Sequence, residues 1–191
     1  MKALEERIRR EGKVLPGEIL KVGSFFNQQM DVRLLMDMGV EIARAFCHAG
    51  VTKVLTVESS GIALAVAAAH ALGVNAVFAK KSASANVSGE LYTAEVYSYT
   101  HKKMNMISVS RDYITAEDCV LIVDDFLATG NAVNGLISIV EKAGARLAGV
   151  SAGIEKGFQG GGDALRARGI RVESLAVIDA FETDNTIRFR P

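Results

Sequence analysis

The chain has 191 residues, of which 49% are hydrophobic, and this is typical of one domain with one well-buried core. Its 22 basic side chains balance its 22 acidic ones, so no net charge attracts nucleic acid or an anionic membrane. The N-terminal sequence MKALEERIRREGK is too charged for a signal peptide, and no later segment approaches the ~20 apolar residues that span a bilayer. We therefore expect a single domain, residues 1–191, in the cytoplasm, with neither nucleic acid nor a membrane as partner.

The two cysteines argue against a zinc site or a redox motif. Cys47 lies within a helical pattern and Cys119 begins an apolar strand, so they lack the close spacing that either kind of site requires. We predict two buried, reduced thiols and no dedicated metal site on the protein.

Hydrophobic periodicity in the first half of the chain predicts a helix followed by a β-α-β unit. Apolar residues recur at helical spacing over 31–48, where Asp31 is a suitable N-cap. The segment VTKVLTV (51–57) predicts a strand, IALAVAAAHAL (62–72) a helix of small residues, and NAVFAK (75–80) a second strand. Strands joined through a helix in this way are parallel.

The same order of elements returns in the second half. VLIVDD (120–125) predicts a strand, residues 130–143 an amphipathic helix, and LAGVSAGIE (147–155) another strand. The sequence therefore predicts an α/β fold with a twisted, mainly parallel, doubly wound sheet that is flanked by helices.

A different pattern separates the two halves. Residues alternate in character in LYTAEVYSY (91–99) and MNMISVS (104–110), which indicates two extended segments at the edge or tips of the sheet. Ser, Asn and Gly residues precede them. We predict that residues 82–101 form a mobile flap.

Polar residues follow three of the predicted strands. Asp124 and Asp125 follow one, and Glu58 and Lys156 follow two others. Ligands of open parallel sheets bind beyond the carboxyl ends of the strands, so these side chains are candidates for one shared site. Acidic pairs also cap strand-to-helix turns and occur in receiver-like domains, and the local spacing alone does not separate these readings.

Small residues follow the acidic pair at the start of a predicted helix. The run from Ala128 to Ala132 offers backbone N–H groups, and the positive end of the helix dipole favours an anion there. A phosphate group fits this position.

The segment VLIVDDFLATGNA contains three aliphatic residues followed by D-D-x-x-A-T-G-x-A. This motif resembles the phosphoribosyl pyrophosphate motif of the type I phosphoribosyltransferases. The segments LKVGSFFNQQMD, VESSGIALAVA and GIEKGFQ extend the resemblance over essentially the whole chain, in the order found in bacterial members that act on xanthine. The resemblance implies the type I fold, with a small hood built from about the first 30 residues and a C-terminal segment, and a homodimer.

The resemblance also implies roles for the polar residues. Asp124 and Asp125 would hold the ribose 2′ and 3′ hydroxyls and favour the positive charge that develops on the sugar. The other implied contacts to phosphoribosyl pyrophosphate are Ala128, Thr129, Gly130, Asn131 and Ala132 for the 5′-phosphate, and Glu58, Ser59, Ser60, Gly61, Lys80 and the catalytic candidate Lys81 for the pyrophosphate. Mg²⁺ carried by the substrate would be the cofactor. Ser59 and Ser60 could equally be helix caps, and the two lysines could be surface residues.

Four residues are candidates for the base site. Lys156 is a donor that matches a purine O6, and Phe158 could stack on the ring, which favours a 6-oxopurine over adenine. Leu20 and Asn27 match the positions that contact xanthine in the family, and the Asn27 amide suits a 2-oxo group. An Asn can also accept from the 2-amino group of guanine, so the preference for xanthine rests on the resemblance.

The sequence departs from many relatives at Ala128, where guanine and hypoxanthine enzymes have an aspartate that assists removal of the N7 proton. Asn131 and Ala132 also replace residues that could offer the 5′-phosphate a hydroxyl. The expected activity is transfer of the phosphoribosyl group to N9 of xanthine. The alternatives are a guanine, hypoxanthine or adenine enzyme, or a regulator that binds phosphoribosyl pyrophosphate without turnover.

Overall fold

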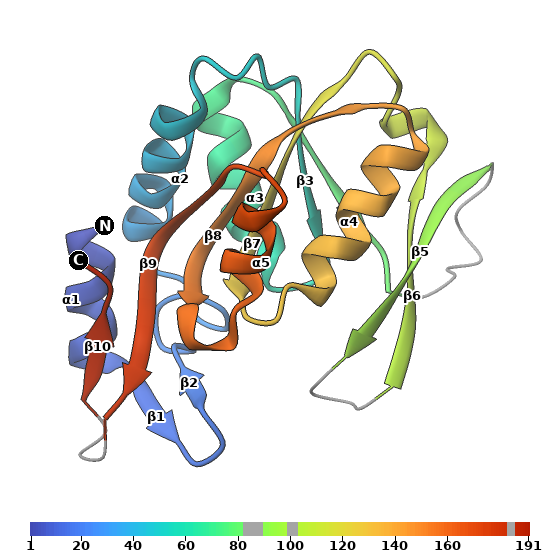
Figure 1. Ribbon diagram of the computed structural model, residues 1–191. Coiled ribbons are helices and arrows are strands. Elements are labelled where there is room, and N and C mark those ends of the chain that lie inside the picture. The colour runs from blue at the N-terminus through green and yellow to red at the C-terminus, as the bar shows by residue number, and fades with distance from the viewer. Residues whose placement is uncertain (82–89, 99–102, 183–185) are drawn as a thin grey trace.

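A six-stranded sheet forms the centre of the molecule (Figure 1). The computed structural model describes residues 1–81, 90–98, 103–182 and 186–191. The strand order is β10-β9-β8-β7-β3-β4, and neighbours are parallel except for β10, which is antiparallel to β9. The strands are β3 (Lys53–Val57), β4 (Asn75–Ala79), β7 (Cys119–Leu127), β8 (Arg146–Lys156), β9 (Val172–Phe181) and β10 (Ile187–Phe189). The predicted twisted, mainly parallel sheet is confirmed.

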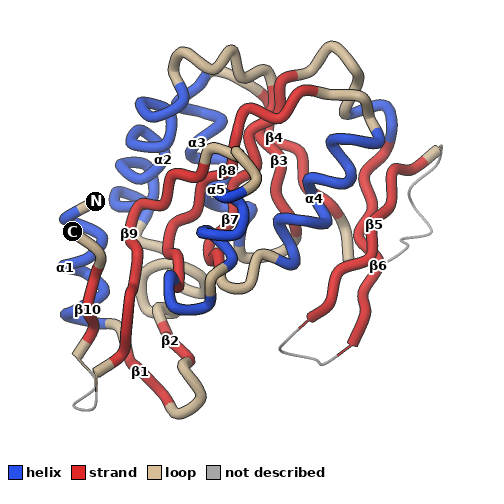
Figure 2. The backbone as a smooth tube through the Cα atoms, viewed as in Figure 1, coloured by secondary structure: helices blue, strands red, loops and turns tan. Residues whose placement is uncertain are grey.

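Helices cover both faces of this sheet, as the tube in Figure 2 shows. On one face lie α1 (Lys2–Glu11), α2 (Val32–Phe46) and α3 (Gly61–Leu72); on the other lie α4 (Asn131–Lys142) and α5 (Gly161–Ala167). Strand β7 shows why two layers form. Its side chains alternate, so that Leu121 and Val123 join the core beneath α2 and α3, while Val120 and Ile122 join the core beneath α4.

The predicted limits of α2 and α3 are close to those observed. The Asp31 carboxylate accepts a hydrogen bond from the backbone N–H of Leu34 at 3.1 Å, which is the expected N-cap of α2. The two helices lie so close together that a Cβ on Gly39 would stand 2.5 Å from the backbone carbonyl group of Ala67. The small residues of α3 thus allow a tight helix pair.

The N-terminal and C-terminal segments lie side by side. Helix α1 is followed by a hairpin of β1 (Lys13–Leu15) and β2 (Ile19–Lys21), and Figure 1 places α1 beside β10. The guanidinium of Arg9 stands 4.5 Å from the centre of the Phe189 ring, which joins the two ends of the chain. These are the segments from which we predicted a hood.

A second hairpin projects from the other side of the sheet. Strands β5 (Leu91–Ser98) and β6 (Lys103–Ser110) pair antiparallel, are followed by the short helix η1 (Arg111–Tyr113), and pack on α4 (Figure 1). Their extended structure agrees with the alternation in the sequence. The remainder of the predicted flap, residues 82–89 and 99–101, lies outside the described residues.

Two expectations need correction. Cys47 is exposed, because it is the C-cap of α2 and lies beyond the last turn that faces the core, whereas Cys119 is buried as predicted. Strand β7 continues to Leu127, so Asp124 and Asp125 lie within the strand and not after it. Within the described ranges, no helix is long and apolar enough to cross a membrane.

Candidate active site

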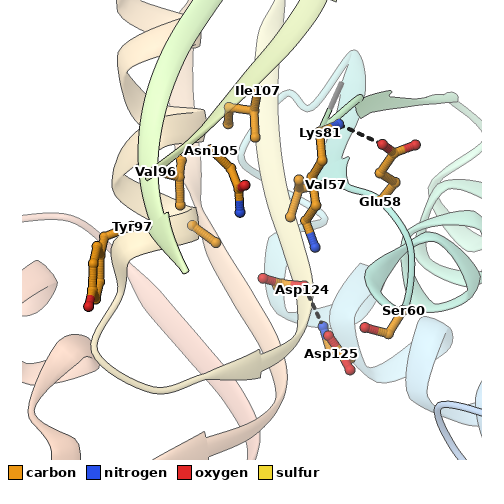
Figure 3. Close-up of a pocket in the computed structure, with 11 residues that line it drawn as sticks. Val57, Glu58, Ser60, Lys81, Val96, Tyr97, Asn105, Ile107, Asp124 and Asp125 are labelled. Atoms are coloured by element: carbon orange, nitrogen blue, oxygen red, sulfur yellow. Dashed lines mark hydrogen bonds between the residues drawn. The ribbon is translucent and has the colours of Figure 1, made fainter. Parts of the chain in front are cut away.

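The acidic pair lines a cavity of about 230 Å³ at the carboxyl ends of the strands (Figure 3). The loop between β3 and α3, the end of β4, strand β7 and the β5–β6 hairpin all contribute to its wall. The lining residues are Val57, Glu58, Ser60, Lys81, Val96, Tyr97, Asn105, Ile107, Asp124, Asp125 and Ala132. Segments that are distant in sequence therefore meet at this cavity.

Asp124 and Asp125 are almost enclosed, with 6% and 7% of their surface exposed. Oδ1 of Asp124 accepts a hydrogen bond from the backbone N–H of Asp125 at 2.9 Å. Burial raises the pKa of the Asp124 carboxyl well above its usual range, and the neighbouring Asp125 raises it further, whereas the ammonium of Lys81 lowers it. A pair of buried carboxylates is well suited to accept hydroxyl donors or to face a positive charge.

Lys81 and Glu58 stand together on the opposite wall. The backbone N–H of Lys81 donates to Oε1 of Glu58 at 2.6 Å, and Figure 3 shows the Lys81 side chain directed toward Asp124. Lys80 is separated from this cavity. Its backbone pairs with Ser108 of β6, and its side chain lines a different cavity of about 340 Å³ along the edge of β4.

The loop before α3 brings small groups close to Asp124. Ser60 lines the cavity and is the N-cap residue of α3. Its side chain makes no capping hydrogen bond, so helix capping does not explain why a serine stands at this position. Ser59 is exposed, and its carbonyl accepts from the N–H of Ile62. A Cβ on Gly61 would lie 2.4 Å from Oγ1 of Thr56 and 2.7 Å from Oδ1 of Asp124, so this position requires glycine.

The segment 128–132, which we name the phosphate loop, lines an adjoining cavity of about 150 Å³. Gly130 has a φ of 82° and immediately precedes the first residue of α4, Asn131. The first N–H groups of a helix have no partner within the helix, so they can donate to a ligand bound beside this segment. This second cavity shares Tyr97, Asp124 and Ala132 with the first, so the two are neighbours.

The candidates for base recognition lie between the hood segment and the end of β8. Nδ2 of Asn27 is 3.4 Å from Oδ2 of Asp125, which links this segment to the acidic pair. Nζ of Lys156 donates to the carbonyl oxygen of Glu18 at 2.8 Å. Burial lowers the pKa of the Lys156 ammonium, and the charge of Glu18 partly offsets this shift.

Leu20 and Phe158 belong to one apolar region. Leu20 is buried in the core beneath α2 and α3, and the partly buried Phe158 packs against the same cluster. The Phe158 ring also meets Phe181 edge to face, with ring centroids 5.3 Å apart. Asn27 thus contacts the acidic pair, Lys156 contacts Glu18 beside the hairpin that carries Leu20, and Leu20 and Phe158 pack in one apolar cluster.

The sequence did not single out the contribution of the hairpin. Val96 and Tyr97 of β5 and Asn105 and Ile107 of β6 line the cavity, although we had no reason to select them. The signal was present in the alternation of MNMISVS, since Asn105 and Ile107 are two residues apart and share a face. What could not be foreseen is that this face turns toward Asp124.

No group of three or more His, Cys, Asp or Glu side chains suited to a metal ion occurs among the described residues. The donors at hand are the carboxylates of Asp124, Asp125 and Glu58, which are oxygen ligands of the kind Mg²⁺ prefers. They fit a metal that arrives with an oxygen-rich ligand and keeps part of its own coordination shell.

Comparison with known proteins agrees with this architecture. Residues 31–159 match the phosphoribosyl transferase domain. The xanthine phosphoribosyltransferase of Lactiplantibacillus plantarum is 53% identical over 96% of this chain and 94% of its own, and that of Lactobacillus delbrueckii subsp. bulgaricus is 51% identical over 98% and 99%.

Solved structures show the same fold at much lower identity. The adenine phosphoribosyltransferase of Rhodothermus marinus covers 93% of this chain and 100% of its own with a TM-score of 0.73 and 22% identity. The Trypanosoma brucei enzyme, in complex with AMP, pyrophosphate and ribose-5-phosphate, covers 95% and 83% with a TM-score of 0.76 and 20% identity. The predicted fold class and family are confirmed: the chain belongs to the type I phosphoribosyltransferase family.

Proposed function

We propose that this protein transfers the 5-phosphoribosyl group from phosphoribosyl pyrophosphate to N9 of xanthine, giving xanthosine 5′-monophosphate and pyrophosphate in purine salvage. The observation that carries this proposal is the identity of 51–53% to enzymes named xanthine phosphoribosyltransferase, which extends over nearly the whole chain. A preference for one base depends on a few side chains, and identity at this level over the full length supports the same arrangement of them.

The acidic pair is the proposed site of the sugar. The Asp124 and Asp125 carboxylates would accept hydrogen bonds from the 2′ and 3′ hydroxyls of ribose. As pyrophosphate leaves C1, the sugar gains positive charge, and carboxylates fixed beside it stabilise that charge. The carboxylates of Asp124, Asp125 and Glu58 would face a Mg²⁺ ion that arrives with the substrate, and this ion would help to neutralise the leaving group.

The phosphate loop is the proposed site of the 5′-phosphate, where the backbone of residues 128–132 and the Thr129 hydroxyl would donate to its oxygens. Pyrophosphate would lie against the loop from Glu58 to Gly61 and accept from Lys81, whose side chain already points into the cavity (Figure 3). Lys80 faces the edge of β4 in the single chain, so it could reach a substrate only in a neighbouring subunit.

Lys156 and Asn27 are proposed to select the base. The Lys156 ammonium has three N–H donors, and its bond to Glu18 leaves donors for O6 of an oxopurine. Adenine offers an amino group at the same position, and leaving donors unpaired typically costs ~1–3 kcal/mol. The Asn27 amide would donate to O2, while Leu20 and Phe158 would contact the ring faces.

No carboxylate occupies position 128, so that position supplies no general base. Xanthine is a comparatively acidic purine, and we propose that it reacts as its anion. The kcat/KM for xanthine should then follow ionisation of the free base. A profile that ignores this ionisation would count against the proposal.

We also propose a homodimer that forms through the edge of β4. Phe78 is 43% exposed and Tyr113 is 59% exposed, and both line the cavity along this edge. Exposed apolar side chains on an edge strand suit a covered surface. Sedimentation should report a dimer that Phe78→Glu dissociates, while Val40→Glu, at a comparably exposed position of α2, leaves it intact.

A cytoplasmic location completes the proposal, because its substrates are cytoplasmic metabolites.

The deciding experiment is pyrophosphate release from phosphoribosyl pyrophosphate and Mg²⁺ with xanthine, guanine, hypoxanthine or adenine, supplied separately and in competition. The proposal predicts turnover with a strong preference for xanthine and poor use of adenine. A preference for guanine or hypoxanthine would overturn the assignment of the base and leave the phosphoribosyl chemistry intact. Binding of phosphoribosyl pyrophosphate with no turnover would indicate a regulator.

A further inference from the structure

The segment between β8 and α5 touches the phosphate loop, and nothing in the proposed chemistry accounts for this contact. It includes the short helix η2 (Gly157–Gln159) and the run Gly160, Gly161 and Gly162 at the start of α5. We propose that Gly161 positions the phosphate loop, and that the ion pair between Glu155 and Arg166 holds Gly161 in place. This inference rests on the proposed function of the phosphate loop as the 5′-phosphate site.

The contact between Gly161 and the phosphate loop joins backbone to backbone. The N–H of Gly161 donates to the carbonyl oxygen of Ala128 at 3.1 Å. A Cβ on Gly161 would lie 2.3 Å from that oxygen, 2.6 Å from the carbonyl carbon of Thr129 and 2.6 Å from the nitrogen of Gly130. Such distances are too short for a carbon atom, and backbone atoms cannot swing aside as a flexible side chain does. Position 161 therefore admits only glycine if the loop is to keep its place.

A buried ion pair fastens α5 from the opposite side. Glu155 is fully buried in β8, and its two oxygens accept from Nη1 and Nη2 of Arg166, each at 2.8 Å. The Ser174 hydroxyl also donates to Glu155. A Cβ on Gly162 would come within 2.0 Å of Oε1 of Glu155, so the start of α5 lies directly on this carboxylate. A buried charge requires such partners, and their fixed geometry holds α5 against β8.

The same short segment carries two of the candidates for the base. Lys156 directly follows Glu155 and Phe158 precedes Gly161 by three residues, while Gly161 contacts Ala128. The 5′-phosphate and the base arrive on separate substrates and are joined through the ribose only in the product, so the phosphate loop and the base site must be held at the spacing of that product. Positioning of the phosphate loop by Gly161 therefore aligns C1 of the sugar with N9 of the base. A small displacement of this kind is enough to lower the rate of a transfer reaction strongly.

The test compares Gly161→Ala with Gly160→Asn. Gly160 has a φ of 76° with nothing within 4 Å of an added Cβ, and Asn tolerates this left-handed conformation and is a good N-cap. Binding of ribose 5-phosphate by calorimetry is the direct probe of the phosphate loop. Gly161→Ala should weaken this binding, and raise the KM for phosphoribosyl pyrophosphate, by about ten-fold to a hundred-fold. The affinity for xanthine alone should change less than about two-fold, and Gly160→Asn should match the parent protein in both assays.

Arg166→Lys is the second variant, because it keeps the charge opposite Glu155 but loses the paired hydrogen bonds of the guanidinium. Arg166→Lys should also weaken the binding of ribose 5-phosphate and raise the KM for phosphoribosyl pyrophosphate, by a smaller factor than Gly161→Ala. If Gly161→Ala does not fold, Arg166→Lys tests the proposal in its place. Unchanged affinity of a folded Gly161→Ala for ribose 5-phosphate would overturn the proposal. So would equal losses for ribose 5-phosphate and xanthine, which a general loss of structure produces. Because binding is measured without turnover, failure of the proposed transferase activity would be seen separately.

Discussion

Asp124 and Asp125 are joined by a hydrogen bond of 2.9 Å from the backbone N–H of Asp125 to Oδ1 of Asp124, and both carboxylates are buried. Two neighbouring acids are thereby held together, and within the described part of the chain Lys81 supplies the compensating charge to Asp124. This arrangement is unfavourable for the free protein and suitable for a ligand that brings hydroxyl donors, Mg²⁺ and developing positive charge.

We predict that Asp124→Asn stabilises the free protein at neutral pH and lowers kcat by about a hundred-fold to a thousand-fold. Because burial raises the pKa of Asp124 in the folded state, the native protein binds this proton more tightly than the unfolded chain does. The stability that this bound proton contributes is fully present below the usual carboxyl pKa of 3.8, and it is lost as the pH rises through the raised pKa of Asp124 in the folded protein. Denaturant unfolding at several pH values should show this decline for the parent protein and not for the variant.

Asp118→Asn is the control of opposite sign. Burial raises the pKa of Asp118, but hydrogen bonds from Thr115 and Thr52 and the charge of Lys53 lower it more, so the net shift is downward. Its contribution is therefore present above the usual pKa and is lost as the pH falls through the lowered one. Asp118→Asn should destabilise the protein at neutral pH with little effect on turnover. A stability gain for Asp118→Asn, or a loss for Asp124→Asn, would contradict this account.

A second prediction concerns Lys156. Lys156→Met keeps much of the apolar stem and removes the donor proposed for O6, so kcat/KM for xanthine should fall by roughly ten-fold to a hundred-fold. Activity with adenine should fall less, because adenine places its own amino donor at this position. Lys2→Met, at an exposed position of α1 away from the base candidates, is the control. Equal losses for both bases would show that Lys156 does not select between them.

The fold and the centre of the site were predictable because they depend on local patterns. Helical spacing and the Asp31 cap located α2. The apolar run before Asp124 located β7, because a parallel strand that is buried on both faces requires a nearly continuous run of apolar residues. The extension of β7 to Leu127 was missed because acidic residues are rare inside strands. The cavity wall formed by Asn105 and Ile107 depends on where a distant hairpin docks, which no local pattern encodes.

The docking of that hairpin supplies a third prediction. A Cβ on Gly135 of α4 would stand 2.4 Å from Cγ2 of Val96 and 3.2 Å from Cδ1 of Ile107, and both of these residues line the cavity. Gly135→Ala should displace the hairpin and lower kcat/KM by about ten-fold. The better helix propensity of alanine, worth about 1 kcal/mol, should offset much of the packing cost in stability.

The control for Gly135→Ala restores the space that the new methyl group occupies. The double variant Gly135→Ala with Val96→Ala removes Cγ2 of Val96, so the hairpin can return and kcat/KM should recover in part. Additive losses in the double variant would show that the two residues act independently and that hairpin docking is not the cause.

The last prediction concerns Thr56, which is 1% exposed in β3 and lies beside Gly61 and Asp124. Its hydroxyl has no hydrogen-bond partner among the residues that the structure describes. Valine has nearly the same shape and favours strands, so Thr56→Val should stabilise the protein by about 1 kcal/mol by removing an unpaired buried group. Thr52→Val is the matched control, because the Thr52 hydroxyl donates to Asp118 and accepts from the N–H of Cys119, each at 2.9 Å. It should lower the free energy of unfolding by ~0.5–1.5 kcal/mol. If Thr56→Val is destabilising in denaturant unfolding, the hydroxyl has a partner such as bound water, and its place beside Asp124 serves the site and not the core.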